Sequence, residues 1–183
     1  PNKKEEEWKF FDLNKIISSN IKDLKFFDKE LFNKENKNLV PKDNLPHKLF
    51  NHNKIVITNG IVGVLDFKYE DIKKIDIINS SENQPSKSKK TLTYLNSAFN
   101  TNYLKIVIKK NYSLNKPVIL YNITNEKITS TNINQRLDIV LEENSALNLI
   151  NFFTDFSGNN FINIYHNFKV GKDSILKNYK IDN

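Results

Sequence analysis

The strongest constraint on the fold is a series of short β-rich segments in the second half of the chain. The segments are Leu104–Lys110, Lys116–Ile123, Arg136–Asn144, Ala146–Thr154, Phe161–Gly171 and Ser174–Asp182. Segments two apart in this series start roughly 25–32 residues from each other, which is within the range of known repeat lengths. A nearly constant step of this size is typical of a coiling chain in which every second strand stacks on the same side. The spacing therefore predicts a mainly β protein built as a β-solenoid.

The N-terminal region has a different pattern and is predicted to be partly helical. Trp8–Ile17 and Ile21–Phe32 carry apolar residues at helical spacing, and the polar stretch Asn33–Asn44 is interpreted as a linker. Ser80–Lys90 is polar, basic and contains a proline, so we expect a mobile loop there. The sequence thus divides into an N-terminal region over residues 1–90 and a repetitive region over residues 91–183.

A β-hairpin is predicted within the N-terminal region. Lys54–Thr58 alternates like a strand, Ile61–Leu65 is apolar, and Asn59-Gly60 lies at the junction of the two runs. Asn-Gly between apolar runs favours a tight type I′ turn, because both central residues of that turn need a positive φ.

A short helix is predicted over Thr91–Phe99, where Leu92, Leu95 and Phe99 fall on one face. We expect it to cover the open end of the first coil, where strand edges would otherwise be unpaired. The chain has only 4 Gly, so asparagine is expected to take the corner positions that require a left-handed backbone. The corner candidates are Asn111, Asn115, Asn125, Asn144, Asn159 and Asn160.

Composition narrows the classes of function. The net charge is +7, but the charge comes from lysine, and Arg136 is the only arginine. Because base-specific recognition favours arginine, we expect no nucleic-acid partner. The chain has no cysteine, which excludes thiolate ligation of a metal or a cluster by this chain. No apolar run approaches the length of a membrane span and no signal peptide is visible, so we expect a cytoplasmic protein without membrane insertion.

Six short motifs, in order along the chain, resemble the SufD family of iron–sulfur cluster assembly proteins. They are Glu5–Leu13 (EEEWKFFDL), Ile55–Gly60 (IVITNG), Tyr94–Phe99 (YLNSAF), Asn115–Val118 (NKPV), Gln135–Leu141 (QRLDIVL) and Lys177–Ile181 (KNYKI). The sequence departs from the family pattern at Phe10-Phe11, where an aromatic-Thr pair is usual, and at Asn178, where histidine is usual.

The resemblance implies a right-handed parallel β-helix preceded by a small helical region and the hairpin. It also implies a non-enzymatic scaffold that acts with SufB and the ATPase SufC to build and transfer clusters. Among family proteins the C-terminal region holds the SufC contact and late coils hold the SufB contact, and this chain is expected to stop after the first coils. We therefore expect no catalytic residue and no directly bound cofactor, with the cluster held at the level of the complex. Exposed coil edges further predict a homodimer.

The residues expected to matter structurally belong to these motifs. They are Trp8, Asn59, Gly60, Leu95, Asn96, Ala98, Phe99, Pro117, Arg136 and Tyr179. Trp8 is interpreted as an anchor for the N-terminal helix, with a partner surface as the alternative.

Other polar groups receive structural interpretations. His47 and His52 are expected at the surface, with a metal site as the weaker alternative, and His166 is expected to be a satisfied or exposed strand residue. The carboxylates of Glu5–Glu7 and Glu142-Glu143 are the densest, and the latter pair is interpreted as a solvated corner. Two rival functions are a β-helix polysaccharide lyase or hydrolase and a structural or adhesion solenoid. The first would need stacked carboxylates with arginine or lysine, which the sequence does not provide.

Overall fold

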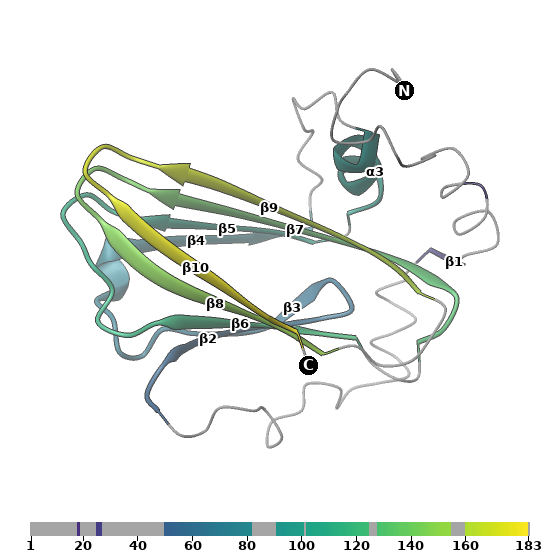
Figure 1. Cartoon of the computed structure of the whole chain (residues 1–183), viewed down its shortest axis with the longest axis horizontal. Helices are drawn as coiled ribbons and strands as arrows, with labels where there is room; N and C mark the ends of the chain where they lie inside the picture. Colours follow the sequence, from purple (N-terminus) through teal and green to yellow (C-terminus); the bar gives the residue numbers. More distant parts are fainter. Residues whose placement is uncertain are drawn as a thin grey trace.

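The protein is mainly β and consists of two five-stranded sheets, A and B, that lie face to face (Figure 1). The computed structural model describes residues 50–81, 91–100, 102–124, 128–154 and 160–182, together with Ser18 and a two-residue strand. Sheet A contains β1 (Lys25–Phe26), β4 (Ile75–Ser80), β5 (Tyr103–Ile108), β7 (Thr131–Leu141) and β9 (Phe161–Val170). Sheet B contains β2 (Asn53–Thr58), β3 (Ile61–Asp66), β6 (Val118–Ile123), β8 (Ala146–Thr154) and β10 (Ile175–Asp182). One 3₁₀ turn, Ile72–Lys74, and one helix, α3 (Thr91–Phe99), complete the described elements.

From β5 onward, successive strands alternate between the two sheets, and from β7 onward each strand pairs in parallel with the strand two before it. In sheet A, Tyr103 lies opposite Arg136, and Arg136 lies opposite Tyr165. In sheet B, Val118 lies opposite Leu149, and Leu149 lies opposite Asn178. Each of the six predicted segments coincides with one of these strands, which confirms the mainly β prediction. The largest difference is at β7, which begins at Thr131 instead of Arg136.

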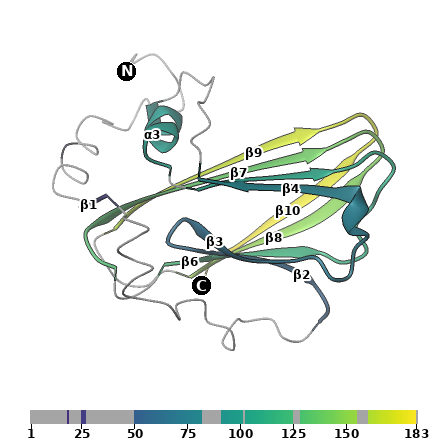
Figure 2. The ribbon, with the colours of Figure 1, turned by 180° about the vertical axis from the view of Figure 1, so that it is seen from behind.

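β3 and β4, which lie at the ends of the two sheets opposite β10 and β9, run antiparallel to their neighbours. β3 pairs with β2, and β4 pairs with β5, so both sheets are mixed (Figure 2). β2 in turn pairs in parallel with β6. The N-terminal strands therefore share both sheets with the C-terminal strands, and the expected division at residue 90 does not coincide with a break between sheets.

The predicted hairpin is confirmed. Thr58 and Ile61 are the last paired residues of β2 and β3, and Asn59 and Gly60 form the turn with φ of 52° and 81°. Both central residues thus have the positive φ of a type I′ turn.

Gly60→Ala is expected to lower the free energy of unfolding by about 1–3 kcal/mol. An added Cβ would lie 3.0 Å from the backbone oxygen of Asn134 and 3.2 Å from Cγ2 of Ile133, on a backbone with positive φ. Thermal and urea unfolding would measure the loss. The matched control is Gly63→Ala, because Gly63 is exposed on β3 and has no positive φ. Equal effects of the two substitutions would contradict this account of Gly60.

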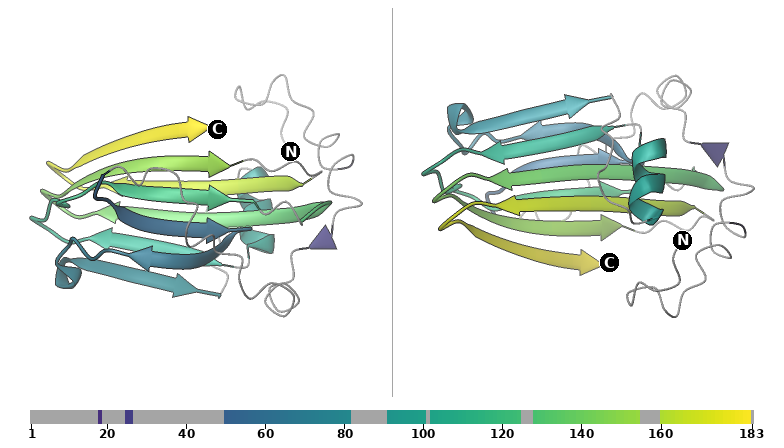
Figure 3. Two further views of the ribbon diagram at one scale, coloured as in Figure 1. Left: turned by 90° about the horizontal axis from the view of Figure 1, so that it is seen from below. Right: turned by 90° about the horizontal axis from the view of Figure 1, so that it is seen from above.

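The helix predicted over Thr91–Phe99 is confirmed, but its expected position is wrong. α3 lies on the outer face of sheet A, across β7 and β9 (Figure 3, right), whereas the first edge is covered by β4. The Nδ2 group of Asn96 donates to the backbone oxygens of Gln135 (2.9 Å) and Asn163 (2.8 Å). Asn163 Nδ2 donates back to the oxygen of Leu92 at 3.0 Å. These polar contacts fix the helix on the sheet face, which hydrophobic spacing alone did not indicate.

The helix predicted over Ile21–Phe32 is wrong at Lys25–Phe26, which form β1 and pair in parallel with Thr131 and Asn132. β7 begins at Thr131, but its pairing with β5 begins only at Arg136. The first residues of β7 therefore have no β5 partner on that side, and β1 pairs with them there. Backbone pairing here overrides the local helical pattern. The remainder of that segment, the Trp8–Ile17 segment, the linker 33–44 and residues 82–90 of the expected loop lie outside the described residues.

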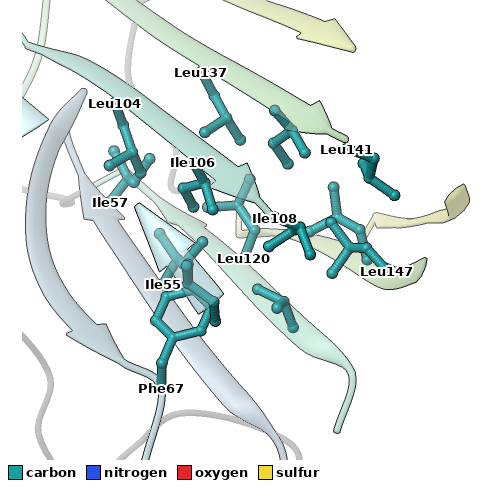
Figure 4. Packing of buried hydrophobic residues seen from close by; sticks show 14 residues of the cluster. Ile55, Ile57, Phe67, Leu104, Ile106, Ile108, Leu120, Leu137, Leu141 and Leu147 are labelled. Carbon is teal, nitrogen blue, oxygen red and sulfur yellow. The ribbon is translucent and has the colours of Figure 1, made fainter. Parts of the chain in front are cut away.

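The hydrophobic core lies between the two sheets and is made of alternate residues of each strand (Figure 4). Sheet A contributes Leu104, Ile106 and Ile108 from β5 and Leu137, Ile139 and Leu141 from β7, all at most 2% exposed. Sheet B contributes Ile55, Ile57, Val118, Leu120, Leu147 and Leu149. A smaller apolar cluster lies on the outer face of sheet B around Tyr121 and Phe152.

Asparagine takes two of the predicted corner positions with a left-handed backbone. Asn111 and Asn144 have φ of 60° and 55°, and Nδ2 of Asn144 donates to Oδ1 of Asn111 at 2.9 Å. Asp173 adopts the same conformation one layer further on, with φ of 55°. Asn115 and Asn160 have no positive φ, and Asn125 and Asn159 lie outside the described residues.

Candidate functional site

A cavity of about 820 Å³ lies between the sheets, where the strands of sheet B end and those of sheet A begin. Its walls come from the hairpin turn and from five strands, β6 to β10. The polar lining residues are Asn59, Asn122, Thr124, Gln135, Thr154, Asn160, His166 and Lys180, and the apolar side chains are Ile123, Ile133, Phe153, Ile162 and Ile164. Gly60 completes the lining. The cavity is of the size that small-molecule sites have.

Amide groups are held in fixed orientations around this cavity. Gln135 Nε2 donates to Oδ1 of Asn122 at 2.7 Å, which links sheet A to sheet B across the interior. Asn160 accepts from the backbone N–H of Thr131 at 3.1 Å and donates to the oxygen of Ile128 at 2.8 Å. These hydrogen bonds hold the amide groups of Gln135, Asn122 and Asn160 in fixed orientations in the described wall of the cavity.

His166 points inward on β9, since it is in register with the buried Leu137. Burial lowers the pKa of His166 to about 4, so the ring is neutral at pH 7. Its Nε2 atom is buried and has no hydrogen-bond partner among the described residues. The expectation of a satisfied or exposed strand residue is therefore wrong, because the alternation of β9 turns this side chain toward the interior.

Among the described residues that line the cavity, Lys180 is the basic side chain. It is in register with Asn151, which is in register with the core residue Leu120, so all three belong to the inward-facing side of sheet B. Its Nζ lies 5.0 Å from the centroid of the Phe153 ring, within the range of a cation–π contact. Lys180 remains solvent-accessible on β10, at the edge of the described sheet.

Arg136 lies outside the cavity, on the outer face of sheet A. Its guanidinium carbon is 5.3 Å from the ring centroid of Tyr103 and 5.6 Å from that of Tyr165, the two residues in register with it. Nε of Arg136 is 3.5 Å from Oδ1 of Asp138, and the hydroxyl of Tyr103 donates to Oδ2 at 3.0 Å. Burial and the neighbouring Asp138 carboxylate raise the pKa of Tyr103 to about 12. This cluster ties three neighbouring strands together.

The other motif residues that were expected to matter structurally lie in different parts of the structure. Asn59 and Gly60 line the cavity, whereas Asn96 belongs to α3 and is buried between this helix and sheet A. On the same helix Leu95 is half-buried and Ala98 and Phe99 are exposed. Pro117 precedes β6 and its oxygen accepts from the backbone N–H of Asn53 at 2.9 Å, while Tyr179 is 56% exposed on β10. Trp8 lies outside the described residues.

The expectation that His52 lies at the surface is wrong, because its side chain is only 5% exposed. Its Nδ1 lies 2.8 Å from the oxygen of Phe50, and its Nε2 lies 3.1 Å from the hydroxyl of the buried Tyr121. The sequence did not indicate that His52 is buried, because it lies in a polar stretch and its partner Tyr121 is distant in the chain. His47 lies outside the described residues, so the structure does not test the alternative of a metal site with His52.

Glu142 and Glu143 stand at an exposed corner, as predicted. Oε2 of Glu142 accepts from the backbone N–H of Lys110 at 2.9 Å, and Oε2 of Glu143 is 2.8 Å from Nζ of Lys110. Both carboxylates thus hold the preceding corner. The group Glu5–Glu7 lies outside the described residues.

No three His, Asp or Glu side chains come together as metal ligands within the described residues. None of the helices described is long and apolar enough to cross a membrane. No protein-family model matches the sequence, and no curated protein matches it.

Proposed function

We propose that the chain is a non-enzymatic scaffold subunit of an iron–sulfur cluster assembly complex, and that its two sheets are the first coils of a right-handed parallel β-helix. The observation that carries the proposal is the strand register. From β5 to β10 the strands alternate between the sheets, and each strand from β7 to β10 is in parallel register with the strand two before it. The parallel partners are about 30 residues apart, which is a step of the size expected for one solenoid coil.

The motifs that resemble the SufD family lie on elements of the expected kind, which supports the proposal. Ile55–Gly60 forms the first strand and turn of the hairpin, and Tyr94–Phe99 lies within α3. Asn115–Val118 leads into β6, and Lys177–Ile181 lies within β10. The proposed partners are SufB and the ATPase SufC in the cytoplasm, and the cluster is held at the level of the complex.

The chemistry of such a subunit lies in protein contacts. Among the described strands, β9 and β10 each have one side without a paired strand, so each presents an edge to a partner. Large apolar side chains are exposed on both, namely Ile162 and Val170 of β9 and Ile175, Tyr179 and Ile181 of β10. Unpaired backbone groups beside apolar side chains are the usual basis for strand addition by another chain.

The test is size-exclusion chromatography with light scattering of this chain mixed with SufB and SufC from the same source. A longer SufD protein serves as the positive control. The proposal predicts that this chain, or at least the longer protein, elutes in a complex with SufB. Failure of both proteins to bind would overturn it, and glycans would then be the ligands to test against the sheet surfaces.

Self-association through the β9 and β10 edges is expected for the isolated chain. The mass measured by light scattering should rise with concentration from 21.4 kDa toward that of a dimer. Tyr179→Lys should suppress this rise, because it places a charge on the exposed edge. Ile72→Lys is the matched control, since Ile72 is 59% exposed on the 3₁₀ turn, outside β9 and β10. A mass independent of concentration would contradict the prediction.

A further inference from the structure

One polar side chain interrupts the apolar row that β7 turns toward the interior. The residues of this row are each at most 4% exposed, and they are Ile133, Gln135, Leu137, Ile139 and Leu141. On β9 the residue in register with Gln135 is again aliphatic, Ile164. An amide turned inward costs free energy unless its polar atoms are hydrogen-bonded. A departure from the packing pattern at one place in the interior is typical of a binding site.

The amide of Gln135 ends a short chain of hydrogen bonds. Asn122 Nδ2 donates to the backbone oxygen of Phe152 at 3.4 Å, and Gln135 Nε2 donates to Oδ1 of Asn122 at 2.7 Å. These bonds orient both amides and leave Oε1 of Gln135 without a partner among the described residues. Because Gln135 lines the cavity, this oxygen belongs to the cavity wall. The wall thus presents a hydrogen-bond acceptor that a ligand can satisfy.

A second polar group in the cavity lining also lacks a partner. His166 follows Ile164 at the next inward position of β9, and Nε2 of its ring has no hydrogen-bond partner among the described residues. Native proteins leave few buried polar atoms unpaired. Two such groups at one cavity indicate that a bound molecule, or water, completes their hydrogen bonds.

The surroundings of Gln135 favour an uncharged ligand. Ile133, Ile162 and Ile164 form an aliphatic wall beside it, and none of the described lining residues is Asp or Glu. A ligand ammonium would therefore be buried without an opposite charge, and a ligand carboxylate could not donate to Oε1. A hydroxyl group can donate without either cost. The volume of about 820 Å³ leaves space for an apolar body of small-molecule size.

We infer that the cavity between the sheets binds a small uncharged molecule that carries a hydroxyl group on an apolar body, a phenol or an alcohol. The hydroxyl donates to Oε1 of Gln135, and the body lies against Ile162 and Ile164. This inference is independent of the proposed scaffold function, because it requires only the isolated chain and no partner protein.

The test compares three probes that share a naphthalene body. 1-Naphthol carries a hydroxyl that keeps its proton at pH 7, 1-methoxynaphthalene carries an ether oxygen that cannot donate, and naphthalene carries no polar group. Equilibrium dialysis against the wild-type chain would measure the three dissociation constants. 1-Naphthol is expected to bind about fivefold more tightly than the other two, because it alone can donate to Gln135. Equal affinities of 1-naphthol and 1-methoxynaphthalene would overturn the inference, and so would no binding of any probe.

Two variants locate the hydroxyl. Gln135→Met removes the acceptor at nearly constant volume and should abolish the preference for 1-naphthol over 1-methoxynaphthalene. Asn151→Leu is the matched control, because Asn151 is an inward amide of β8 that is 4% exposed, does not line the cavity and is in register with Leu120. This control should keep the preference. A preference that survives in Gln135→Met, or that both variants lose equally, contradicts the inference.

A third variant locates the apolar body. Ile164→Trp fills the cavity and should weaken binding of all three probes, whereas unchanged binding would place the probes elsewhere and overturn the inference. Should a variant not fold, the wild-type chain labelled with ¹⁵N still decides. The side-chain amide resonances of Gln135 should shift on titration with 1-naphthol, and the absence of a shift would overturn the inference.

Discussion

Leu137→Ala is expected to lower the free energy of unfolding by about 3–5 kcal/mol. Leu137 is fully buried on β7 and is part of the core between the sheets. β7 has β5 on one side and β9 on the other, so its backbone cannot shift to refill the space left by the lost methyl groups. Urea unfolding followed by circular dichroism would measure the change.

Val140→Ala on the same strand is the matched control. Val140 points to the outer face of sheet A and is only partly buried, so its truncation should lower the free energy of unfolding by about 1 kcal/mol. If the two variants were equally stable, the space between the sheets would not be the main core. The denaturant dependence should stay unchanged, because neither substitution alters the surface exposed on unfolding.

A loss of stability in mild acid is the second large expected effect. The folded protein keeps His166 neutral down to pH about 4, whereas the same side chain in the unfolded chain binds a proton near pH 6.5. As the pH falls, the unfolded state therefore takes up the proton first and is favoured. Stability from neutral His166 is fully present above pH 6.5 and is lost progressively toward pH 4, by about 2–3 kcal/mol in all.

His166→Leu isolates this contribution, because leucine is the residue at the matching positions of β5 and β7. Urea unfolding at pH 7 and at pH 4.5 would be compared for the two proteins. Carboxylates titrate in both, so only the difference between the proteins reports on His166. The wild-type chain should lose about 2 kcal/mol more than the variant over this interval. Parallel losses would show that His166 is solvated in the folded state.

The repetitive half of the fold could be predicted from the sequence because its strands are short, locally patterned and separated by recognisable corners. Asn59-Gly60 and the corners at Asn111 and Asn144 each carry their own conformational signal, so no distant partner is needed to place them. The helix bounds were predictable for the same reason.

The position of the helix and the cavity could not be predicted, because both depend on contacts between distant residues. Asn96 meets carbonyl groups of two strands that lie far along the chain. Glu70 gave no signal in sequence, yet its two oxygens accept hydrogen bonds from Asn53, Tyr112, Asn115 and Lys116. His166 and Lys180 are separated in sequence by a turn, and only the strand register turns both toward the same space.

The order of strand pairing also sets an order of events during synthesis on the ribosome. β2 has its parallel partner in β6, with Asn53 opposite Val118, so the first parallel pair of sheet B cannot form until Val118 has been synthesised. Each later strand pairs with the strand two before it and waits for a much shorter stretch of chain. Nascent chains that end before β6 can form the antiparallel β2–β3 and β4–β5 pairs but not the parallel β2–β6 pair, so they should be more protease-sensitive than longer chains. Beyond that length, protection should advance in increments of one strand, because each new strand pairs with a strand that has already been synthesised.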